Sequence, residues 1–515
     1  MRDGSDVGHD NKDNKGNKGN KGNNNDNRSP GNQDDKGKPA FVSKAYAHFD
    51  RPLSREKVTA LLSAPQNVAR HAFWPLILDP VMVVSRKTEI GQNGQRRWSR
   101  KPRPIALAAH VDAHIHAHYA GILSQRLEAR YAAAPALSRA VLAYRRFKSP
   151  RCNVHFALEA FEEIRQRGAC DVLALDIRSF FDHLSHRLLK KAWKDVLGCD
   201  SIPEDHYAVF KAVTQSPAIT VSALRDIFGG EIRRRTGQTG ARICSTEEFR
   251  QRVAPLLRPL PELVSSLTGR AFQPGTGIPQ GIAISTVLAN LYMLATDELL
   301  LTELGALGGS YRRYSDDILV ILPTGQGAQA EARVKQAVAA AGLEIHDGKT
   351  RRYRFSTDVG NGQSFQMDEH WQIIDRGAVS YLGLSDDGQA VRIRESTISR
   401  FMEKATGAVE RAHIAAARRD DPHLRKRLLY TRLTRLGYGQ AYGEHFDPSG
   451  ILPKGAPRLG FFKYLKLVER VTQSPAVRKQ AAQLENRVHR LIALHEVLLQ
   501  KELQEKAQKR AGCAS

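Results

Sequence analysis

The sequence predicts a mixed α+β fold, with strands and helices alternating through the middle of the chain and a helical region after them. Runs of β-branched and aliphatic residues at 172–177 and 311–322 are typical of buried strands. Apolar residues recur at helical spacing over 111–134 and 153–167, and nearly everything from Ser396 onward has this character. With 41% hydrophobic residues, the 515-residue chain can bury a core of roughly three packing units.

The remaining elements follow from local signals. Residues 1–39 are mostly Asn, Lys, Gly and Asp, a composition that predicts a disordered tail, and structure is expected from Phe41. The stretches 82–90 and 95–107 predict a two-stranded ribbon, because Asn93-Gly94 suits the turn between them. Residues 198–268 mix helix-like pieces with Pro and Gly and are interpreted as an insertion. A further helix is expected at 328–341, with strands near Ile373 and Tyr381.

The positive charge of the chain is clustered. Lys and Arg number 78 against 54 Asp and Glu, for a net charge of +24. Clusters create a field, whereas scattered charges are mostly solvated, so a polyanionic partner such as nucleic acid is expected. The clusters lie at residues 96–103, 233–235, 349–354 and 418–435.

Cysteine use and hydropathy indicate a protein of a reducing compartment that does not enter a membrane. The five cysteines have neither C-x-x-C nor disulfide-like spacing, which favours the cytoplasm; they are Cys152, Cys170, Cys199, Cys244 and Cys513. The N-terminal region lacks a signal-peptide core, and no apolar run reaches the roughly 18 residues that span a bilayer.

Two adjacent carboxylates, Asp316 and Asp317, lie in a predicted turn between the YRRY strand and the apolar run at 318–322. Alone, they favour a solvated hairpin turn, because Asp is a common turn residue. Carboxylates on a rigid hairpin can also hold divalent ions for phosphoryl transfer. Asp176 ends another buried strand, VLAL, where it could instead cap a helix. A Gly/Pro turn at 275–281 then leads into a helix that carries Leu288, Leu291 and Leu299; the order of the three elements favours the metal site.

At this level the sequence resembles the bacterial reverse transcriptases, a group that includes retron, group II intron and defence-associated enzymes. DIRSFFDHL, GIPQGIAIS, YSDD, GLEIHDGKT and YLGL look like palm motifs A to E, and RKPRPIALAAHVD and AYRRFKS look like fingers motifs. The resemblance covers roughly residues 75–390. It implies a right-hand polymerase with fingers (40–170), a palm of antiparallel sheet and helices (171–390, with a fingers insertion at about 198–270) and a basic helical thumb with a C-terminal helix (391–515).

The resemblance implies a two-metal site for nucleotidyl transfer. Asp176 and Asp316 would bridge two Mg²⁺ ions, or Mn²⁺, with Asp317 beside them and the Ile177 carbonyl as a further oxygen ligand. The ions would activate the primer 3′-hydroxyl and neutralise charge on the triphosphate. Lys349 would protonate the leaving pyrophosphate, although alone it could be a solvated turn lysine.

Other residues carry implied roles around the nucleotide. Lys101 and Arg103 would clamp the triphosphate, and Gln280 would contact the incoming nucleotide. Phe181, five residues beyond Asp176, matches the steric gate that crowds the sugar 2′ position, which favours DNA as the product; packing in the core is the alternative. Contacts with nucleic acid are expected from Tyr381, Leu382, Gly383, Arg425, Lys426 and Arg427.

Two departures leave the subfamily open. Ser315 stands where the family most often has Ala, and the helix after PQG begins IST where group II intron enzymes usually have Ser-Pro. The sequence lacks the C-x-x-C pairs that would suggest a zinc-supported nuclease. The chain after YLGL leaves little room for a ribonuclease H or integrase domain. A free-standing enzyme in antiphage defence is therefore the nearest interpretation, on family analogy alone.

The expected partners are an RNA template, which could be a dedicated non-coding RNA, together with DNA product and dNTPs. The near-heptad spacing of Leu484, Val488, Leu491 and Leu498 leaves a homo-oligomer or a partner protein open, although intramolecular packing is the commoner use of such a stripe. His110, His114 and His118 have helical i, i+4 spacing that could hold a transition metal, but packing within the fingers is favoured.

Three functions stay open from the sequence. The first is RNA-templated DNA synthesis. The second is untemplated or protein-primed synthesis on the same fold. The third is an RNA-binding, maturase-like protein whose catalysis is dispensable. The set of Asp176, Asp316 and Asp317 argues against the third function.

Overall fold

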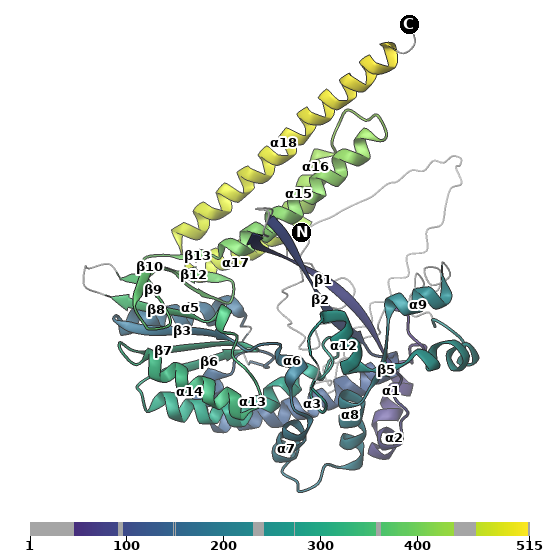
Figure 1. The fold of residues 1–515 in the computed structure, drawn as a ribbon, viewed down its shortest axis with the longest axis vertical. Helices are drawn as coiled ribbons and strands as arrows, with labels where there is room; N and C mark the ends of the chain where they lie inside the picture. Colours follow the sequence, from purple (N-terminus) through teal and green to yellow (C-terminus); the bar gives the residue numbers. More distant parts are fainter. Residues whose placement is uncertain are drawn as a thin grey trace, which may run out of the picture. The chain divides into compact units, whose positions relative to one another are not determined.

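The computed structural model describes residues 46–90, 96–147, 149, 151–229, 242–271, 273–356, 362–436 and 460–512 (Figure 1), with side chains described outside 80–101, 435–436 and 512. The predicted tail at 1–39, the basic cluster at 233–235 and Cys513 lie outside these residues. The mixture of helices and strands in the described chain confirms the α+β class. Among the described residues, no helix is long and apolar enough to cross a membrane.

A six-stranded antiparallel sheet holds the middle of the chain together. Its order is β10-β9-β8-β3-β7-β6. The apolar runs predicted as strands form β3 and β7, which are neighbours and pair with each other from Cys170 opposite Pro323 to Asp176 opposite Asp317. The strands are β3 (Cys170–Asp176), β6 (Ser310–Tyr314), β7 (Asp317–Pro323), β8 (Arg351–Ser356), β9 (Gln363–Met367) and β10 (Ile373–Arg376).

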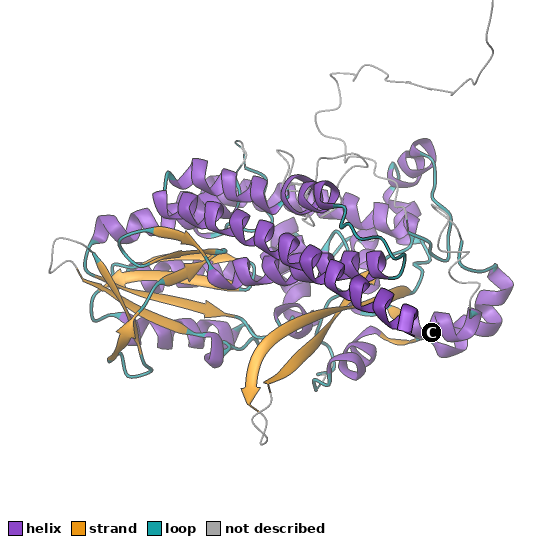
Figure 2. Cartoon of the chain, turned by 90° about the horizontal axis from the view of Figure 1, so that it is seen from above, coloured by secondary structure: helices purple, strands orange, loops and turns teal. Residues whose placement is uncertain are grey.

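The adjacent strands β3 and β7 are mainly apolar because helices cover both faces of the sheet; within β3 the exception is Asp171, which is fully buried and accepts from Arg354 Nε at 2.7 Å. Cys170 and Val172 of β3 pack in one cluster with α5 (Asn153–Arg167). Leu173 and Leu175, on the opposite face, pack in another with α13 (Ser285–Gly305) and α14 (Gly327–Ala340). Figure 2 shows these strands in orange among the purple helices. A strand buried on both faces has no reason to alternate apolar and polar residues.

The predicted ribbon is confirmed as β1 (Leu76–Ile90) and β2 (Arg96–Leu107), which pair antiparallel. Two short strands that the sequence did not predict widen it: β4 (Pro217–Thr220) runs parallel to β1, and β5 (Arg258–Pro259) pairs with β4. The ribbon leads directly into α3 (His110–Ala133). The segment interpreted as an insertion therefore supplies strands to the same sheet as the ribbon.

Helices surround these sheets. Two precede the ribbon, α1 (Arg55–Leu62) and α2 (Pro65–Ala69), and α4 (Pro135–Ala140) lies between the ribbon and β3. Two follow β3, α6 (Phe180–His183) and α7 (His186–Leu197). The 198–268 segment contains α8 (Glu204–Thr214), α9 (Val221–Phe228), α11 (Thr246–Glu248) and α12 (Leu260–Thr268). After the central sheet come three short strands, β11 (Val379–Tyr381), β12 (Leu384–Asp386) and β13 (Val391–Ile393), which form a sheet of their own.

The C-terminal region is helical, as predicted, with α15 (Glu395–Ala417), α16 (Lys426–Tyr430), α17 (Phe461–Thr472) and α18 (Pro475–Gly512). Leu484 and Val488 of α18 are buried against other helices of this region, so the apolar stripe serves intramolecular packing there. Farther along, Ile492 and Leu499 are the buried positions, while Leu498 is 45% exposed. The inclusion of Leu498 in the apolar stripe was wrong, because the helix has 3.6 residues per turn and not the 3.5 that a heptad repeat assumes.

Candidate active site

The three predicted aspartates meet at one edge of the central sheet. Asp176 ends β3 directly opposite Asp317, the first residue of β7. Asp316 lies in the turn between β6 and β7, and its carbonyl accepts a hydrogen bond of 2.9 Å from the amide of Ile177. Residues more than a hundred positions apart in the sequence are thus neighbours because two antiparallel strands bring them there.

A fully buried ion pair supports the turn that carries Asp316. Arg313 donates to both carboxylate oxygens of Asp297 at 2.7 and 2.6 Å, and its Nη1 donates to the Ser315 carbonyl at 3.1 Å. Tyr311 also donates to Asp297, at 2.7 Å. A buried, charge-assisted bidentate pair of this kind fixes geometry. The sequence did not predict this pair, because its one signal there is a charged residue inside a strand pattern.

Two residues beside the turn have strained backbones. Ser315 and Tyr144 have φ of 62° and 60°, and their hydroxyl oxygens lie 3.1 Å apart. Left-handed conformations are unfavourable for residues with a side chain and persist only where the surroundings enforce them. Burial raises the pKa of Tyr144, so its hydroxyl remains protonated. The serine that departs from the family pattern therefore has a specific partner in the AYRRFKS stretch.

The neighbouring carboxylates disfavour one another's ionised form. Burial, followed by the charge of Asp176, raises the pKa of Asp316. Burial and the charges of Asp316 and Asp176 raise the pKa of Asp317 to about 7, although Asp317 is exposed at the surface, where solvent screens these effects. Lys349 opposes this effect, and its Nζ donates to Asp176 Oδ1 at 2.6 Å. Arg394, which the sequence analysis missed, also lowers the pKa of Asp317. An excess of negative charge favours a bound cation.

The oxygen donors suit Mg²⁺ or Mn²⁺ chemically, but the structure does not preform a metal site. Across the described residues, no group of three or more His, Cys, Asp or Glu side chains is placed to hold a metal ion. One oxygen of Asp176 is bonded to Lys349 instead. Hard divalent ions prefer carboxylate and carbonyl oxygen, which is what Asp176, Asp316, Asp317 and Ile177 offer. The two-ion assignment stays a prediction that requires Lys349 to leave Asp176.

Gln280 is linked to the ribbon that carries the predicted triphosphate clamp. Its carbonyl accepts a 2.6 Å hydrogen bond from the Ala106 amide of β2, and its Nε2 donates to Asp182 at 3.3 Å. The next residue must be glycine: Gly281 has φ +105°, and a Cβ there would lie 2.7 Å from Ile105. Arg103 lies on β2 with an exposed side chain. The side chain of Lys101 lies outside the described residues.

Phe180 and Phe181 are the first residues of α6, the helix that follows β3 and Asp176. Phe180 is buried in the core, whereas Phe181 is only partly buried against it, with the two rings 5.5 Å apart. The Phe181 carbonyl accepts from the Ile278 amide at 2.9 Å, which ties α6 to the loop of Gln280. The partial exposure of Phe181 is compatible with a gate, and the packing interpretation applies more fully to Phe180.

The YLGL motif is only partly available for contact with nucleic acid. Tyr381 is 4% exposed and packs in the cluster with α5, so its side chain belongs to the core. Its inclusion among the surface contacts needs correction, because alternate residues of β11 face inward. Leu382 and Gly383 form the turn, with φ of 48° and 92°, and the Leu382 carbonyl accepts from Asn153 Nδ2 at 2.9 Å.

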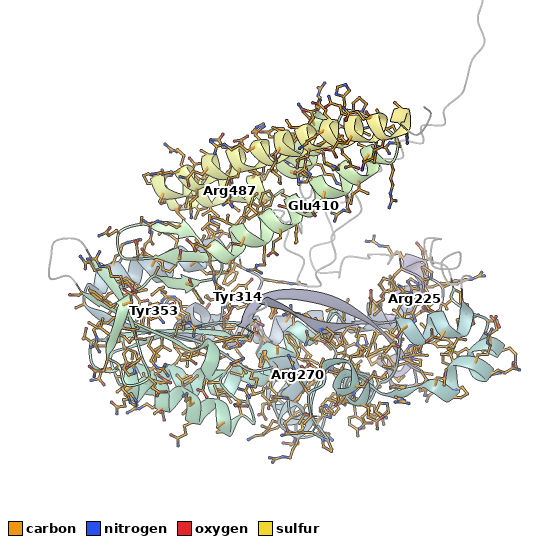
Figure 3. The ribbon with its side chains drawn as sticks, turned by 45° about the horizontal axis from the view of Figure 1, so that its top comes forward. Arg225, Arg270, Tyr314, Tyr353, Glu410 and Arg487 are labelled. Atoms are coloured by element: carbon orange, nitrogen blue, oxygen red, sulfur yellow. The ribbon has the colours of Figure 1, made fainter. Side chains whose placement is uncertain are left out.

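Arg425, Lys426 and Arg427 are exposed at the start of α16. Lys426 forms an ion pair with Glu496 of α18. Lys426 and Arg427 also line a pocket with Arg490, Tyr430 and His489, and the last two rings stack at 4.4 Å. Figure 3 shows the side chains that cover α15 and α18. The predicted basic residues are therefore accessible.

The histidines of α3 serve packing. His110 is buried and stacks on Tyr46 with ring centroids 5.4 Å apart, and His118 lies edge-on to Tyr119. Asp112, between them in sequence, accepts from His71 Nε2 at 2.7 Å. The four described cysteines are free.

No family model matches the chain, and no curated protein matches it. Among solved structures, the chain is similar to three telomerase structures at low identity. Apo telomerase from Candida tropicalis has 10% identity and a TM-score of 0.37 over 82% of this chain and 65% of that one. Apo telomerase from Candida tropicalis truncated from the C-terminal domain has 11% identity and a TM-score of 0.34 over 61% of this chain and 55% of that one. Telomerase from Candida albicans, in complex with the TWJ fragment of telomeric RNA, has 9% identity and a TM-score of 0.32 over 87% of this chain and 63% of that one. The chain thus spans less than two thirds of each, and at these TM-scores the likeness carries no argument.

Proposed function

We propose that this chain is an RNA-directed DNA polymerase that transfers nucleotides at Asp176, Asp316 and Asp317. The observation that carries the proposal is the pairing of Asp176 with Asp317 across two buried strands, with Asp316 in the adjoining turn. The motif order supports it. Rigid elements holding carboxylates at one sheet edge are what positioning chemistry requires.

Each group of the site would have a separate role in nucleotide transfer. Two divalent ions held by these oxygens would activate the primer 3′-hydroxyl and offset charge on the triphosphate. Lys349, whose Nζ donates to Asp176 Oδ1 at 2.6 Å, would release this carboxylate to the ions and donate a proton to the leaving pyrophosphate. Arg103 would contact the triphosphate from β2. Phe181 would exclude a sugar 2′-hydroxyl by its volume.

The experiment that tests this function is primer extension with purified protein and dNTPs on an RNA template, followed by sequencing of the product. A product complementary to the supplied RNA supports templated synthesis. A product unrelated to any RNA present, with and without co-purifying RNA, would favour untemplated or protein-primed synthesis. Absence of incorporation on every template would contradict both and favour an RNA-binding role.

A role in bacterial antiphage defence, in the cytoplasm, completes the proposal on motif resemblance alone. Phage should form fewer plaques on cells that express the wild-type chain than on cells that express Asp316→Asn. Equal plating across a panel of phages would contradict this role and leave the polymerase proposal standing.

A further inference from the structure

Asp182 connects α6, which carries Phe181, with the loop that carries Gln280. It lies on α6, one residue after Phe181. Its Oδ1 accepts from Gln280 Nε2 at 3.3 Å, and its Oδ2 accepts from Arg270 Nη1 at 3.0 Å. The same Arg270 nitrogen donates to Ser179 Oγ at 2.7 Å. Arg270 follows α12 and is labelled in Figure 3.

We propose that Arg270 and Asp182 orient the carboxamide of Gln280 and that Arg270 is thereby a positioning residue for the incoming nucleotide. This inference rests on the proposed function. It concerns how a residue expected to contact the nucleotide is held, and it assigns a role to a cation that neither the motifs nor the metal site use.

The orientation follows from hydrogen-bond chemistry. An ionised carboxylate only accepts, so Gln280 must present its amide nitrogen to Asp182 and turn Oε1 the other way. The terminal torsion of Gln is broad and roughly two-fold, so without this partner the nitrogen and oxygen could exchange places. A carboxamide with a fixed acceptor end distinguishes a donor on the ligand from an acceptor.

Arg270 in turn fixes the carboxylate. The Asp182 side chain is 18% exposed and has one oxygen directed to each partner. Arg270 bridges this carboxylate to Ser179, whose φ of 47° places it in the left-handed region at the start of α6. Removing Arg270 would let Asp182 adopt other rotamers and release Gln280.

The loop itself does not depend on this pair. The Gly277 and Ile278 amides donate to the carbonyls of Leu184 and Phe181, both at 2.9 Å, and His186 Nε2 lies 2.7 Å from the Gly277 carbonyl. The Arg270 side chain is 48% exposed, and exposed ion pairs contribute little stability. Loss of Arg270 should therefore disturb the Gln280 side chain without unfolding its loop.

The test is steady-state incorporation by full-length protein on a saturating RNA template–primer, with kcat and KM for dNTP measured separately. Arg270→Gln and Asp182→Asn should each raise KM by about tenfold, the loss expected for one charge-assisted hydrogen bond, with kcat changed less than about twofold. Arg270→Lys should recover part of the affinity. In a Gln280→Ala background, Arg270→Gln should have no further effect.

Arg130→Gln is the matched control, because Arg130 is an exposed arginine paired with Glu298 at 3.2 Å, away from this network. It should leave both constants and the melting temperature unchanged.

Three results would overturn the inference. One is an unchanged KM in Arg270→Gln. Another is an effect of Arg270→Gln that persists in the Gln280→Ala background, since Arg270 would then act elsewhere. The third is a lowered melting temperature with reduced kcat and constant KM, which would show a purely structural role. A wild-type protein that incorporates nothing would overturn the proposed function, and this inference with it; an active wild type with indifferent variants would overturn this inference only.

Discussion

At the residue scale, the contact between Tyr144 and Ser315 links Ser315 of the aspartate turn to a distant segment, and both residues have left-handed backbones. Each strained residue costs on the order of 1 to 3 kcal/mol, so the surrounding structure must hold both in place. The hydroxyl pair is one such restraint, and the Arg313 bond to the Ser315 carbonyl is another. The position of Asp316 therefore depends on side chains that have no expected contact with the metal ions or the nucleotide.

We expect Tyr144→Phe and Ser315→Ala each to lower kcat by about two- to tenfold, the loss of one hydrogen bond between neutral groups. Because both remove the same bond, the double variant should be no worse than the more affected single variant. Rates of the four proteins under single-turnover conditions check this. Multiplicative losses would mean that the hydroxyls act independently.

Phe181 makes a second prediction at this scale. Phe181→Val should raise the ratio of ribo- to deoxynucleotide incorporation because a smaller wall admits the 2′-hydroxyl. Phe180→Val is the matched control: it removes buried volume from the neighbouring core residue and should cost stability while leaving the ratio unchanged. If Phe181→Val only melts earlier and keeps the wild-type ratio, Phe181 is core packing. A wild type that prefers ribonucleotides would contradict DNA as the product.

At the element scale, long elements were predictable and short ones were not. β3 and β7 contain runs of apolar residues because helices bury both faces, so these runs appear directly in the sequence. β4 has four residues and pairs with β1, far away in the chain, which no local pattern records. The bonds of Asp182 to Gln280 and of Arg313 to Asp297 likewise depend on tertiary packing. The motif aspartates were found because their residue types and order carry the signal.

Helix α3 makes the stability of the fold depend on pH. Burial, and then the charge of His71, lowers the pKa of His116 to about 4, from about 6.5 in an unfolded chain. Between these values the unfolded state binds more protons, so stability is present above pH 6.5 and is lost as pH falls toward 4. At pH 5 the loss from His116 is about 2 kcal/mol.

Urea denaturation of wild type and His116→Leu at pH 7.5 and pH 5 measures this effect. The variant should lose less stability than wild type between the two pH values. His48, whose pKa burial also lowers to about 4, keeps part of the dependence in both proteins. An identical loss in the two proteins would show that His116 is already accessible to protons in the folded state.

At the scale of the whole molecule, the net charge of +24 predicts binding to nucleic acid that weakens steeply with salt. Arg425, Lys426 and Arg427 are exposed on α16 and available for phosphate contacts. Their joint replacement by Gln should reduce the slope of log Kd against log salt by about one per lost contact.

Replacement of three exposed basic residues on α7, Arg187, Lys190 and Lys191, is the control for total charge. It removes the same formal charge from another surface and should leave the slope close to that of wild type. Equal effects of the two replacements would indicate a general field rather than a path along α16.

The central claim is that the aspartates at the edge of the β3–β7 pair perform nucleotidyl transfer. Primer extension on an RNA template with Mg²⁺, by wild type, Asp316→Asn and Asp317→Asn, tests it most directly, with RNA binding and melting temperature measured on the same preparations. We predict that each variant loses incorporation by several orders of magnitude, binds RNA as the wild type does, and melts no earlier, because a source of charge repulsion has been removed. Incorporation by either variant at the wild-type rate would contradict the assignment.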